Sequence, residues 1–387
     1  MLPSHVDVAI IGGGPVGCYL ANALAAQGKS VCVLEKESQP RSDDPRMLAI
    51  SAGGKQLLSN LGCWDSILED SPISYVSVTQ KGYLGHTELS ASEIGENVLG
   101  YVVPYQRLHP LLVSRVKAPA SYIPQTEVSN IQFTSAYAVI QYQQSTESSA
   151  QKELTARLVV LADGGQLASK VGQIEYKERD YEQSALITLV QAEFQPRDTA
   201  FERFVEDGAI ALLPRPGGYA LIWTGPTSLS EERKSWSDTE LLKALQAQLG
   251  SKAGKFTAVG ARHLVPLKLR YAKTLVSPRC VVIGNAAQYL HPIAGQGLNL
   301  GLRDAHDLAL LLSKHPDPGS ESCLSRYPSI RRLDKLNGVG FTDSLIRLFG
   351  VPKLGHARGL GLMALEAMPP LKRKLLGHLA YGIRGNV

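Results

Sequence analysis

The chain has 387 residues, of which 44% are hydrophobic and 19% charged, and its 36 Gly and 22 Pro are spread along its length. This composition excludes a disordered, collagen-like or coiled-coil protein, and the length predicts two or three domains or one large α/β unit with an inserted lobe. Forty Lys and Arg against 35 Asp and Glu leave a net charge of only +5. We therefore expect a globular protein that binds no nucleic acid.

Cysteine usage and the N-terminus indicate the compartment. The five cysteines stand far apart without a CxxC pair, which predicts neither a disulfide framework nor a metal site and fits a reducing compartment. The first residues, LPSHVDVAIIGGG, lack the basic region and the cleavage site of a signal peptide, and no apolar run reaches the roughly 20 residues that span a bilayer. We expect a cytoplasmic protein without a metal, with peripheral membrane contact left open.

The chain begins with a pattern typical of nucleotide-binding proteins. Val6 to Ile11 is a continuous apolar run, as expected for a strand covered on both faces, and glycines follow at once. An apolar face at helical spacing then predicts a helix that ends at Gly28, and residues 30–34 form a second buried strand. A strand, a helix and a strand within about 30 residues predict a βαβ unit with parallel strands.

Two kinds of strand alternate in the rest of the chain. VSVTQ, ALITLVQAEF, AIALLP, YALIWTG and VPLKLR predict a mainly antiparallel sheet, whereas RLVVLA (157–162) and CVVIG (280–284) return to the buried parallel type. From residue 299 onward the pattern is helical. We therefore predict an α/β protein with a discontinuous nucleotide domain (1–71, 101–175 and 270–330), an inserted antiparallel substrate domain (72–100 and 176–269) and a helical C-terminal region (331–387).

The glycine run GGGPVG at residues 12–17 has the spacing G-x-G-x-x-G between a strand and a helix. Gly12 allows the tight turn, Gly14 lets the backbone approach a pyrophosphate, and Gly17 lets the helix pack closely on the strand. Glu35, at the end of the next strand, would accept hydrogen bonds from ribose hydroxyls and disfavours a 2′-phosphate. FAD or NAD is therefore expected rather than NADP, and a plain glycine turn is the alternative.

Two further buried strands end in polar turns. One ends in Asp163-Gly164, and the other ends in Gly284-Asn285 and continues through LHPIAGQGLNLGLRDA (290–305). Together with GGGPVG, these segments resemble the FAD-dependent aromatic hydroxylases related to p-hydroxybenzoate hydroxylase, over essentially the whole chain. Within that family the sequence of residues 290–305 is most similar to that of the ubiquinone-biosynthesis branch. The Gly-Asn pair followed by Gln288 most resembles the 2-polyprenyl-6-methoxyphenol hydroxylases. The resemblance implies a Rossmann-like FAD-binding domain of the GR2 type.

The resemblance also implies which residues hold the flavin. Backbone N–H groups of residues 297–299 would face the pyrimidine edge of the ring, where negative charge gathers on reduction. Each of these segments also has a purely structural alternative. The glycines at 295 and 297 could form only a loop and a helix cap, and Arg46 could be a solvated surface residue. Tyr105 and Gln106 could simply begin a helix, and Asp163 could form only an Asp-Gly turn. The implied FAD contacts are Gly12, Gly14, Pro15, Val16, Gly17, Glu35, Lys36, Arg46, Met47, Tyr105, Gln106, Asp163, Gly164, Gly284, Asn285, Pro292, Gly295, Gln296, Gly297, Leu298 and Asn299.

The sequence departs from the family pattern at two places. Asn285 is neutral where most relatives have Asp, so its hydrogen bond to a ribityl hydroxyl would lack charge assistance, a difference of roughly 1 kcal/mol. After Asp163-Gly164 the Ser and Arg usual in relatives are displaced, and Ser169 and Lys170 inherit no role. As in relatives, no second Rossmann site is visible for the nicotinamide.

The mechanism implied by the resemblance transfers one oxygen atom of O2, through a flavin C4a-hydroperoxide, to a ring carbon of a phenol, with NAD(P)H as transient reductant. It demands a dry pocket, which we expect the strands AIALLP and YALIWTG to line, and an ionised phenol. The backbone carbonyl of Pro292 would face the reacting centre. His291 is a candidate base, although a histidine beside a proline is more often structural; Tyr219 and Tyr289 are alternatives.

The implied substrate is a polyprenyl phenol, which must be withdrawn from a membrane or a partner protein. The C-terminal segment PPLKRKLLGHLAYGIRG places Lys372, Arg373, Lys374 and Arg384 around leucines, which fits a helix on anionic lipid or on a protein of a ubiquinone-biosynthesis complex. The simpler alternative is a helix packed on its own domain. Hydroxylation at another ring position or of another aromatic compound, and a non-catalytic scaffold, remain as other functions. A flavin halogenase is disfavoured because no WxWxIP segment is present.

Overall fold

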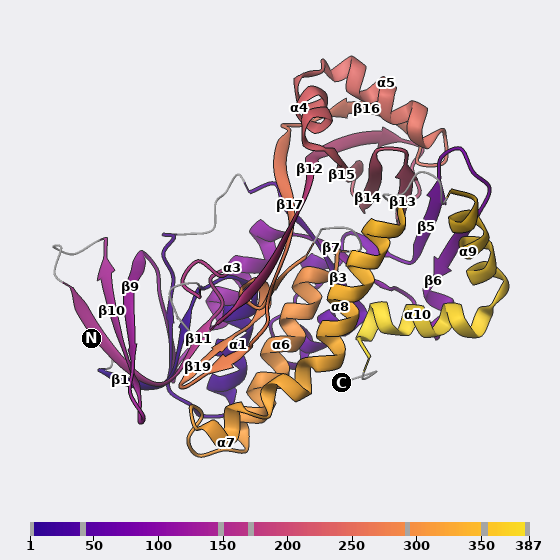
Figure 1. Cartoon of the computed structure of the whole chain (residues 1–387). Coiled ribbons are helices and arrows are strands. Elements are labelled where there is room, and N and C mark those ends of the chain that lie inside the picture. Colours follow the sequence, from indigo (N-terminus) through magenta and orange to yellow (C-terminus); the bar gives the residue numbers. More distant parts are fainter. Residues whose placement is uncertain are drawn as a thin grey trace.

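The computed structural model describes residues 4–38, 44–145, 151–168, 174–290, 295–349 and 355–383. Its lower lobe is built on an eight-stranded sheet of order β18-β19-β11-β1-β2-β8, with β10 and β9 continuing from β11 (Figure 1). The strands are β1 (His5–Ile11), β2 (Val31–Leu34), β8 (Ala120–Ile123), β9 (Thr126–Phe133), β10 (Ala138–Gln144), β11 (Lys152–Leu161), β18 (Val276–Ser277) and β19 (Cys280–Val282).

The centre of this sheet is parallel, as the sequence predicts. β1 pairs in parallel with β2 and β11, and β11 pairs in parallel with β19. Apolar side chains of these strands are buried on both faces of the sheet, which explains their continuous hydrophobic runs. Helices α1 (Pro15–Ala26), α3 (Tyr105–Arg115) and α6 (Gln296–Ser313) pack against them. The carboxyl ends of β1, β2, β11 and β19 therefore meet at one edge.

The upper lobe is a nine-stranded sheet of order β20-β17-β12-β15-β14-β13-β5-β6, with β16 beside β12. One face packs against α5, whose start is fixed by the reciprocal cap between Ser237 and Glu240, and encloses a second core around Tyr219 and Trp223. The elements are β5 (Tyr75–Gln80), β6 (His86–Ser90), β12 (Tyr176–Glu193), β13 (Thr199–Val205), β14 (Gly208–Arg215), β15 (Gly218–Pro226), β16 (Lys255–Val259), β17 (His263–Ala272), β20 (Gln288–Tyr289), α4 (Thr227–Ser235) and α5 (Asp238–Leu249).

Two long strands connect the lobes. β12 has 18 residues and pairs antiparallel with β17 from Tyr176 to Ile187, with one irregularity between Asp180 and Gln183. Both strands run from the lower sheet into the upper one (Figure 1). The sequence predicted the apolar half of β12 but not its polar first half, because residues 177–183 carry charges on nearly every position.

A small sheet and the C-terminal helices lie between the lobes. β7 (Gly100–Pro104) pairs antiparallel with β3 (Met47–Ser51) and β4 (Pro72–Ile73). α9 and α10 lie on the side of the molecule opposite to the N-terminus (Figure 1). The domain limits given above stay a prediction. The remaining helices are α2 (Ala52–Asn60), η1 (Ser66–Leu68), η2 (Ala91–Ile94), η3 (Gly284–Ala286), α7 (Glu321–Leu324), α8 (Tyr327–Phe349), α9 (Gly355–Ala367) and α10 (Pro369–Tyr381).

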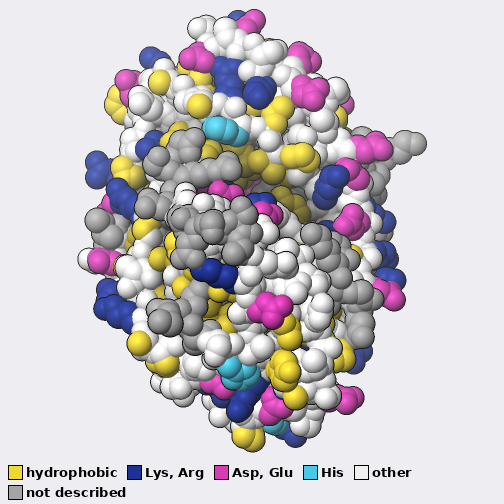
Figure 2. Space-filling view, turned by 90° about the vertical axis from the view of Figure 1, so that its left-hand side faces the viewer, with side chains coloured by type: hydrophobic (Ala, Val, Ile, Leu, Met, Phe, Trp, Pro, Cys, Tyr) yellow, Lys and Arg dark blue, Asp and Glu magenta, His cyan; other side chains and the backbone are white. Residues whose placement is uncertain are grey.

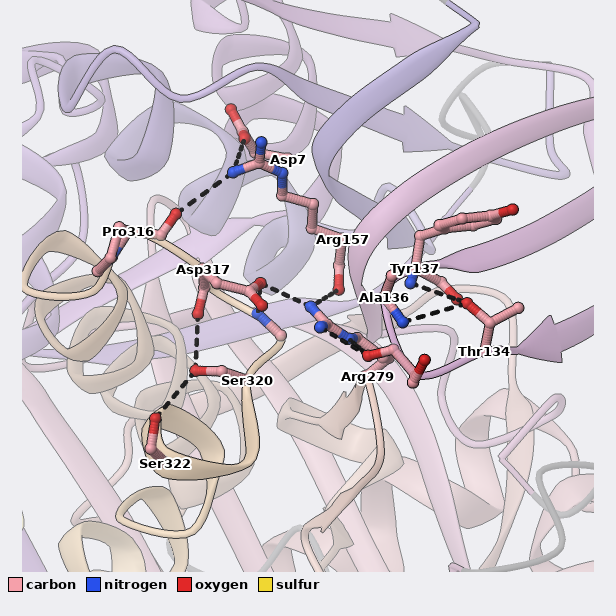
Figure 3. Close-up of polar contacts among 12 residues, drawn as sticks. Asp7, Thr134, Ala136, Tyr137, Arg157, Arg279, Pro316, Asp317, Ser320 and Ser322 are labelled. Carbon is pink, nitrogen blue, oxygen red and sulfur yellow. Dashed lines mark hydrogen bonds and ion pairs between the residues drawn. The ribbon is translucent and has the colours of Figure 1, made fainter.

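Arg279 fixes the turn that leads into β19. It has a positive φ of 58° and is buried. Its guanidinium donates to the carbonyl of Ser135 at 2.8 and 3.0 Å, to the carbonyl of Arg157 at 3.3 Å and to Asp317 Oδ1 at 2.6 Å (Figure 3). The third strand of the nucleotide-binding edge is thus tied to the β9–β10 turn and to the loop after α6.

All five cysteines are free thiols in the interior. In the described part of the chain, no helix is long and apolar enough to cross a membrane. Nor do three or more His, Cys, Asp or Glu side chains gather there in a way that could hold a metal ion.

Candidate functional site

A polar cavity of about 350 Å³ lies at the carboxyl edge of the parallel strands. It joins residues that are far apart in the sequence: Gly12 and Gly14 after β1, Glu35 after β2 and Asp163 after β11. Arg46 and Tyr105 also line it. The structure therefore brings together the first two of the three sequence-predicted flavin segments in one cavity.

The glycine turn is shaped as its spacing predicts. Gly12 has a φ of +102°, and a Cβ there would lie 2.6 Å from the carbonyl oxygen of Ala162. Gly14, in contrast, has open space where a Cβ would be. Both oxygens of Glu35 accept backbone hydrogen bonds, one from Gly13 N at 2.5 Å and one from Glu37 N at 2.9 Å. Glu35 thus holds the turn and also faces the cavity.

His109 is a member of this site that the sequence did not reveal. Its Nε2 lies 2.6 Å from the carbonyl oxygen of Gly13, and the ring is buried against the glycine turn. Burial lowers the pKa of His109, so the ring is neutral at pH 7 and donates this hydrogen bond. The two residues are 96 positions apart, and no local spacing indicates the contact.

Arg46 and its neighbours form the rim of the cavity. The guanidinium lies over the ring of Tyr105, 3.9 Å from its centre, and pairs with Asp44 at 2.5 Å. Gln106 donates to the backbone carbonyl of Asp44 at 2.9 Å, which fixes the same loop. Lys36 pairs at 2.8 Å with Glu127. The Tyr105 ring therefore packs against the Arg46 guanidinium and holds it in place. Gln106 fixes the loop that contains Asp44 and does not line the polar cavity.

Asp163 combines the two roles that its sequence context left open. One carboxylate oxygen accepts from Gly165 N at 2.9 Å and the other from Leu167 N at 2.6 Å, as in a turn-forming Asp-Gly. The residue also lines the polar cavity. Gly164 has a φ of +73° and open space around it. The turn thus holds the carboxylate at the wall of the cavity.

The third segment is anchored by a buried charge cluster. Asp304 on α6 accepts hydrogen bonds from Gly284 N at 3.0 Å and from the Gln288 amide at 2.5 Å. Arg331 on α8 pairs with Asp304 at 2.7 Å. Burial raises the pKa of the Asp304 carboxyl, although Arg331 opposes that shift. Arg331 also contacts Asp307 at 2.5 Å and Asp334 at 2.7 Å. Asp304 lies in the LNLGLRDA segment, whose sequence does not by itself indicate this anchoring role.

Around this anchor the remaining predicted residues divide into packing and exposed positions. Val16 packs where a Cβ on Gly284 would lie, so it belongs to the α1–η3 contact, and Leu298 packs on the core. Asn285 is exposed. Gly17 lies against the carbonyl of Gly12, and Pro15 is the first residue of α1.

The N-terminus of α6 is held by the side chain of Asn299. Its amide donates to Ala49 O at 2.9 Å and to Gly295 O at 3.2 Å, and its oxygen accepts from Ser51 N at 2.9 Å. The Asn299 side chain is therefore occupied within the protein, and only its backbone is left for a ligand. Gly295 has a φ of +58°, and Gly297 has open space around it. His291 and Pro292 lie outside the described residues.

A second cavity, of about 520 Å³, is almost entirely apolar. It begins at Gly295 and Gln296, beside β3, and is closed by α9 and α10. Its strand wall comes from β5, β6 and β13, together with residues of β3, β4 and β7, and not from β14 and β15 as the sequence suggested. Leu212, Leu221, Tyr219 and Trp223 of those two strands instead lie in the core behind the sheet. The lining includes Val76, Val78, Leu89, Glu202, Phe204, Arg358, Leu362, Leu365, Leu371, Leu375, Leu376 and Leu379.

A third cavity, of about 530 Å³, separates the small sheet from the upper lobe, and Met47 lines it together with Leu189 and His263. Figure 2 shows hydrophobic side chains in a hollow between the two lobes. Met47 therefore lies away from the polar cavity. Tyr289, at the end of the chain's short β20, is half-buried and pairs with Arg270 on β17.

Two candidate residues do not occupy the positions that the sequence suggested. Tyr219 is fully buried behind the upper sheet, beside Phe201 and Phe256, so it is no base for a ligand. Lys372 is 6% exposed and pairs at 3.0 Å with Glu93 and with Glu366, so it is not part of a lipid-facing basic edge. α10 packs on its own chain through one face, as in the simpler alternative, while Arg373 and Lys374 are exposed.

Comparison with known proteins places this geometry in a family. A family model described as an FAD binding domain matches residues 5–335. The chain therefore belongs to this FAD-binding family, and it is a flavoprotein of the aromatic hydroxylase class, as the resemblance implied.

Particular relatives agree with this class. The chain is 34% identical to the ubiquinone hydroxylase UbiL of Rhodospirillum rubrum, over 96% of this chain and 89% of the relative. It is 31% identical to the 3-demethoxyubiquinol 3-hydroxylase of Escherichia coli, over 97% and 98%. The solved structure of p-nitrophenol 4-monooxygenase PnpA from Pseudomonas putida superposes with a TM-score of 0.78 at 19% identity, covering 99% of this chain and all of that one, and shares the fold.

Proposed function

We propose that this protein hydroxylates the ring of a polyprenylated phenol in ubiquinone biosynthesis, with 2-polyprenyl-6-methoxyphenol as substrate and the corresponding benzoquinol as product. The observation that carries the proposal is the apolar cavity, which starts at the N-terminus of α6 and is closed by leucines of α9 and α10. Such a cavity suits a phenol with a long hydrocarbon chain. The relatives named as ubiquinone-biosynthesis hydroxylases support it.

The polar cavity fits FAD. The open space at Gly14 admits a pyrophosphate beside the N-terminus of α1, and Glu35 keeps acceptor capacity for ribose hydroxyls. Asn285 would reach the ribityl chain, and the backbone N–H groups of residues 297–299 the pyrimidine edge. Bound FAD would supply the electron transfer and oxygen chemistry, with NAD(P)H as transient reductant and O2 as co-substrate. Roles for Pro292 and His291 stay predictions.

The apolar cavity supplies what this chemistry demands of the protein. Leucine, valine and phenylalanine side chains exclude water from the ring-binding space, and Asn299 holds the start of α6 against β3. The prenyl chain would lie along α9 and α10. The chain's own residues would thus bind the phenol ring, orient it and keep water away from it.

Deletion of the gene tests the assignment in the cell. We expect 2-polyprenyl-6-methoxyphenol to accumulate, as identified by mass spectrometry of extracted lipids. Accumulation of a different precursor would move the hydroxylation to another ring position. An unchanged quinone pool would contradict the proposal.

A pair of tryptophan substitutions on α9 tests the cavity itself. Leu365 lines the cavity, whereas Leu360 is 67% exposed on the same helix and does not. We expect Leu365→Trp to raise KM for 2-farnesyl-6-methoxyphenol at least about tenfold, because lost apolar contact of roughly 1.4 kcal/mol has that effect. Leu360→Trp is the control and leaves KM unchanged. Equal KM values in both variants would place the prenyl chain elsewhere.

The outer surface of α9 and α10 suits contact with the membrane that holds such a substrate. Met363, Met368 and Leu371 are about half exposed, and Leu371 also lines the cavity. Arg373 and Lys374 stand exposed beside them. We expect co-sedimentation with vesicles containing anionic phospholipid, weakened when Met363 and Met368 are both changed to Asp. Sedimentation that does not respond to this change would count against a membrane contact and favour a protein partner.

A further inference from the structure

The apolar cavity contains one acidic side chain that neither the fold nor the polar cavity uses. Glu202 lies in the middle of β13, paired with Ala211 on β14 and with Val78 on β5. Ala200 and Phe204, two residues away on either side, are apolar and face the same way. Glu202 therefore enters the cavity from an apolar strand face.

No partner neutralises this carboxyl group among the described residues. Its Oε1 is buried and accepts no hydrogen bond from them. The next residue, Arg203, points to the opposite face, where it donates to Thr79 Oγ1 at 3.2 Å. Glu202 is thus set apart from the ordinary acidic residues of the sheet, which are exposed or paired.

Among the described residues, the other charged groups around the cavity form no ion pair with Glu202. On α9, Glu366 accepts from Thr87 Oγ1 on β6 at 2.6 Å and pairs at 3.0 Å with Lys372 of α10. Arg358 on α9 also lines the cavity. Burial raises the pKa of Glu202 to about 8, and no charge in the described structure opposes that shift. The carboxyl therefore changes its protonation state near physiological pH.

A buried, unpaired carboxyl group is costly to a fold. An alanine or valine at position 202 would satisfy β13 equally well, as its neighbours on the same face show. The cost is explained if a ligand in the cavity supplies the missing partner. A phenol hydroxyl is such a partner, because it can donate a hydrogen bond and lose its proton.

We propose that Glu202 is the acid–base residue that touches the phenolic hydroxyl of the substrate, an inference that rests on the proposed function. The Glu202 carboxylate takes the hydroxyl proton: the phenol O–H bond breaks, its electron pair stays on the phenol oxygen, and an O–H bond forms on the carboxyl group. The electron-rich phenolate directs the new C–O bond to a carbon ortho or para to that oxygen. The proton returns to the ring oxygen when the product forms.

The chemistry matches the position of Glu202. A general base works best when its pKa lies near the working pH, and a free phenol ionises near pH 10. In this cavity, from which water is excluded, the phenol would give its proton to the Glu202 carboxylate, whose pKa is raised toward that of the phenol. The base, Glu202, therefore lies in the wall of the apolar cavity, on strand β13, which is far in sequence from the glycine-rich loops.

The test uses the FAD-loaded protein and 2-geranyl-6-methoxyphenol as probe. Without reductant, difference absorbance of the phenolate reports ionisation of the bound probe; with NADH or NADPH and O2, product is measured across pH 6–9.5. We expect wild-type protein to ionise the bound probe and its turnover to rise with an apparent pKa near 8. Glu202→Gln should abolish ionisation and lower turnover about 100-fold or more, while FAD content and probe affinity stay within about threefold.

Two further variants make the outcome decisive. Glu202→Asp keeps a carboxyl group and should restore ionisation and turnover to within about tenfold of wild type. Glu88→Gln removes an exposed carboxyl of β6 in the same sheet and should change nothing. Ionisation and turnover unaffected in Glu202→Gln, or lost in a folded Glu202→Asp, would overturn the role of Glu202 while the proposed function stands. Wild-type protein that neither binds nor hydroxylates the probe would overturn the proposed function itself.

Discussion

The polar and the apolar cavity are built in different ways. The polar cavity lies at the carboxyl ends of β1, β2 and β11, and most residues that line it end these strands or follow them within a few positions; Arg46, Tyr105 and the start of β9 complete its wall. The apolar cavity is lined by elements from separate parts of the chain: β3, β4 to β6, the start of β7, β13, the start of α6, and α9 with α10. One cavity is a property of local turns, and the other of long-range packing.

The difference explains how each cavity is stabilised. Backbone hydrogen bonds and buried charges fix the polar cavity, as Glu35 does for Gly13 and Asp304 for Gly284. The lining of the apolar cavity is set mainly by side-chain volume, and polar contacts such as those of Asn299 and Lys372 lie at its edges. Removing a charge should therefore damage the first cavity, whereas adding volume should damage the second.

The largest effect is expected from the charge cluster beneath η3. Arg331→Met leaves Asp304, Asp307 and Asp334 without their shared cation, and should lower the free energy of unfolding by about 3–5 kcal/mol. Urea unfolding measures it. Arg332→Met is the matched control, because Arg332 is exposed beside it. Equal stability of both variants would show that the cluster does not anchor the site.

A valine placed in each cavity separates their functions. A Cβ at Gly14 or at Gly361 meets no atom within 4 Å, so both valine variants should fold. Gly14→Val fills the polar cavity, and we expect FAD affinity to fall about 100-fold, equivalent to roughly 2.7 kcal/mol. Gly361→Val narrows the apolar cavity and should keep FAD while weakening binding of a prenylated phenol. Flavin fluorescence titration of both proteins checks this, and loss of FAD in both would mean that the cavities are not independent.

The smallest effect concerns the pH dependence of stability. The pKa of Glu202 is about 8 in the folded chain against 4.5 for an ordinary glutamate, so the native state holds a proton that the unfolded state has lost. Stability must then fall as pH rises from about 4.5 to about 8, by about 1–2 kcal/mol from this residue, since part of its side chain is in reach of solvent. Glu202→Gln should remove that fall. His109 and His306 titrate in both proteins and cancel.

Thermal unfolding of wild type and Glu202→Gln at pH 5 and pH 8.5 measures the difference. Glu88→Gln again serves as control and should follow the wild-type curve. Parallel pH profiles for wild type and Glu202→Gln would mean that the carboxyl is solvated in the native state, and that the wall of the apolar cavity is wetter than its composition implies.

Sequence patterns predicted the polar cavity because its chemistry is local. The parallel strands, the glycine turn, Glu35 and Asp163 follow from spacing and burial within short windows. The role of His109 could not be predicted, because its partner, the carbonyl oxygen of Gly13, lies 96 residues away in the sequence. The side chain of Asn299 has a structural task, set by β3, that its own neighbours do not reveal.

The apolar cavity was only partly predictable. Strands β14 and β15 are apolar on both faces, so alternation does not tell which face meets the ligand and which meets α5. The sequence predicts a surface lysine at position 372 because its two glutamate partners, Glu93 of η2 and Glu366 of α9, reach it only through tertiary packing. Glu202 stands in a segment without a motif, and only its burial distinguishes it from a surface glutamate.

The interior position of every thiol has a chemical consequence for a flavoprotein that handles oxygen. Burial raises the pKa of Cys32 and Cys63 to about 11 and that of Cys280 to about 12, and only the thiolate form attacks peroxide readily. Hydrogen peroxide that escapes from an unproductive cycle therefore finds no reactive cysteine on the folded protein. The enzyme should survive its own by-product for as long as it stays folded, and cysteine oxidation would serve as a sensitive sign that it has opened.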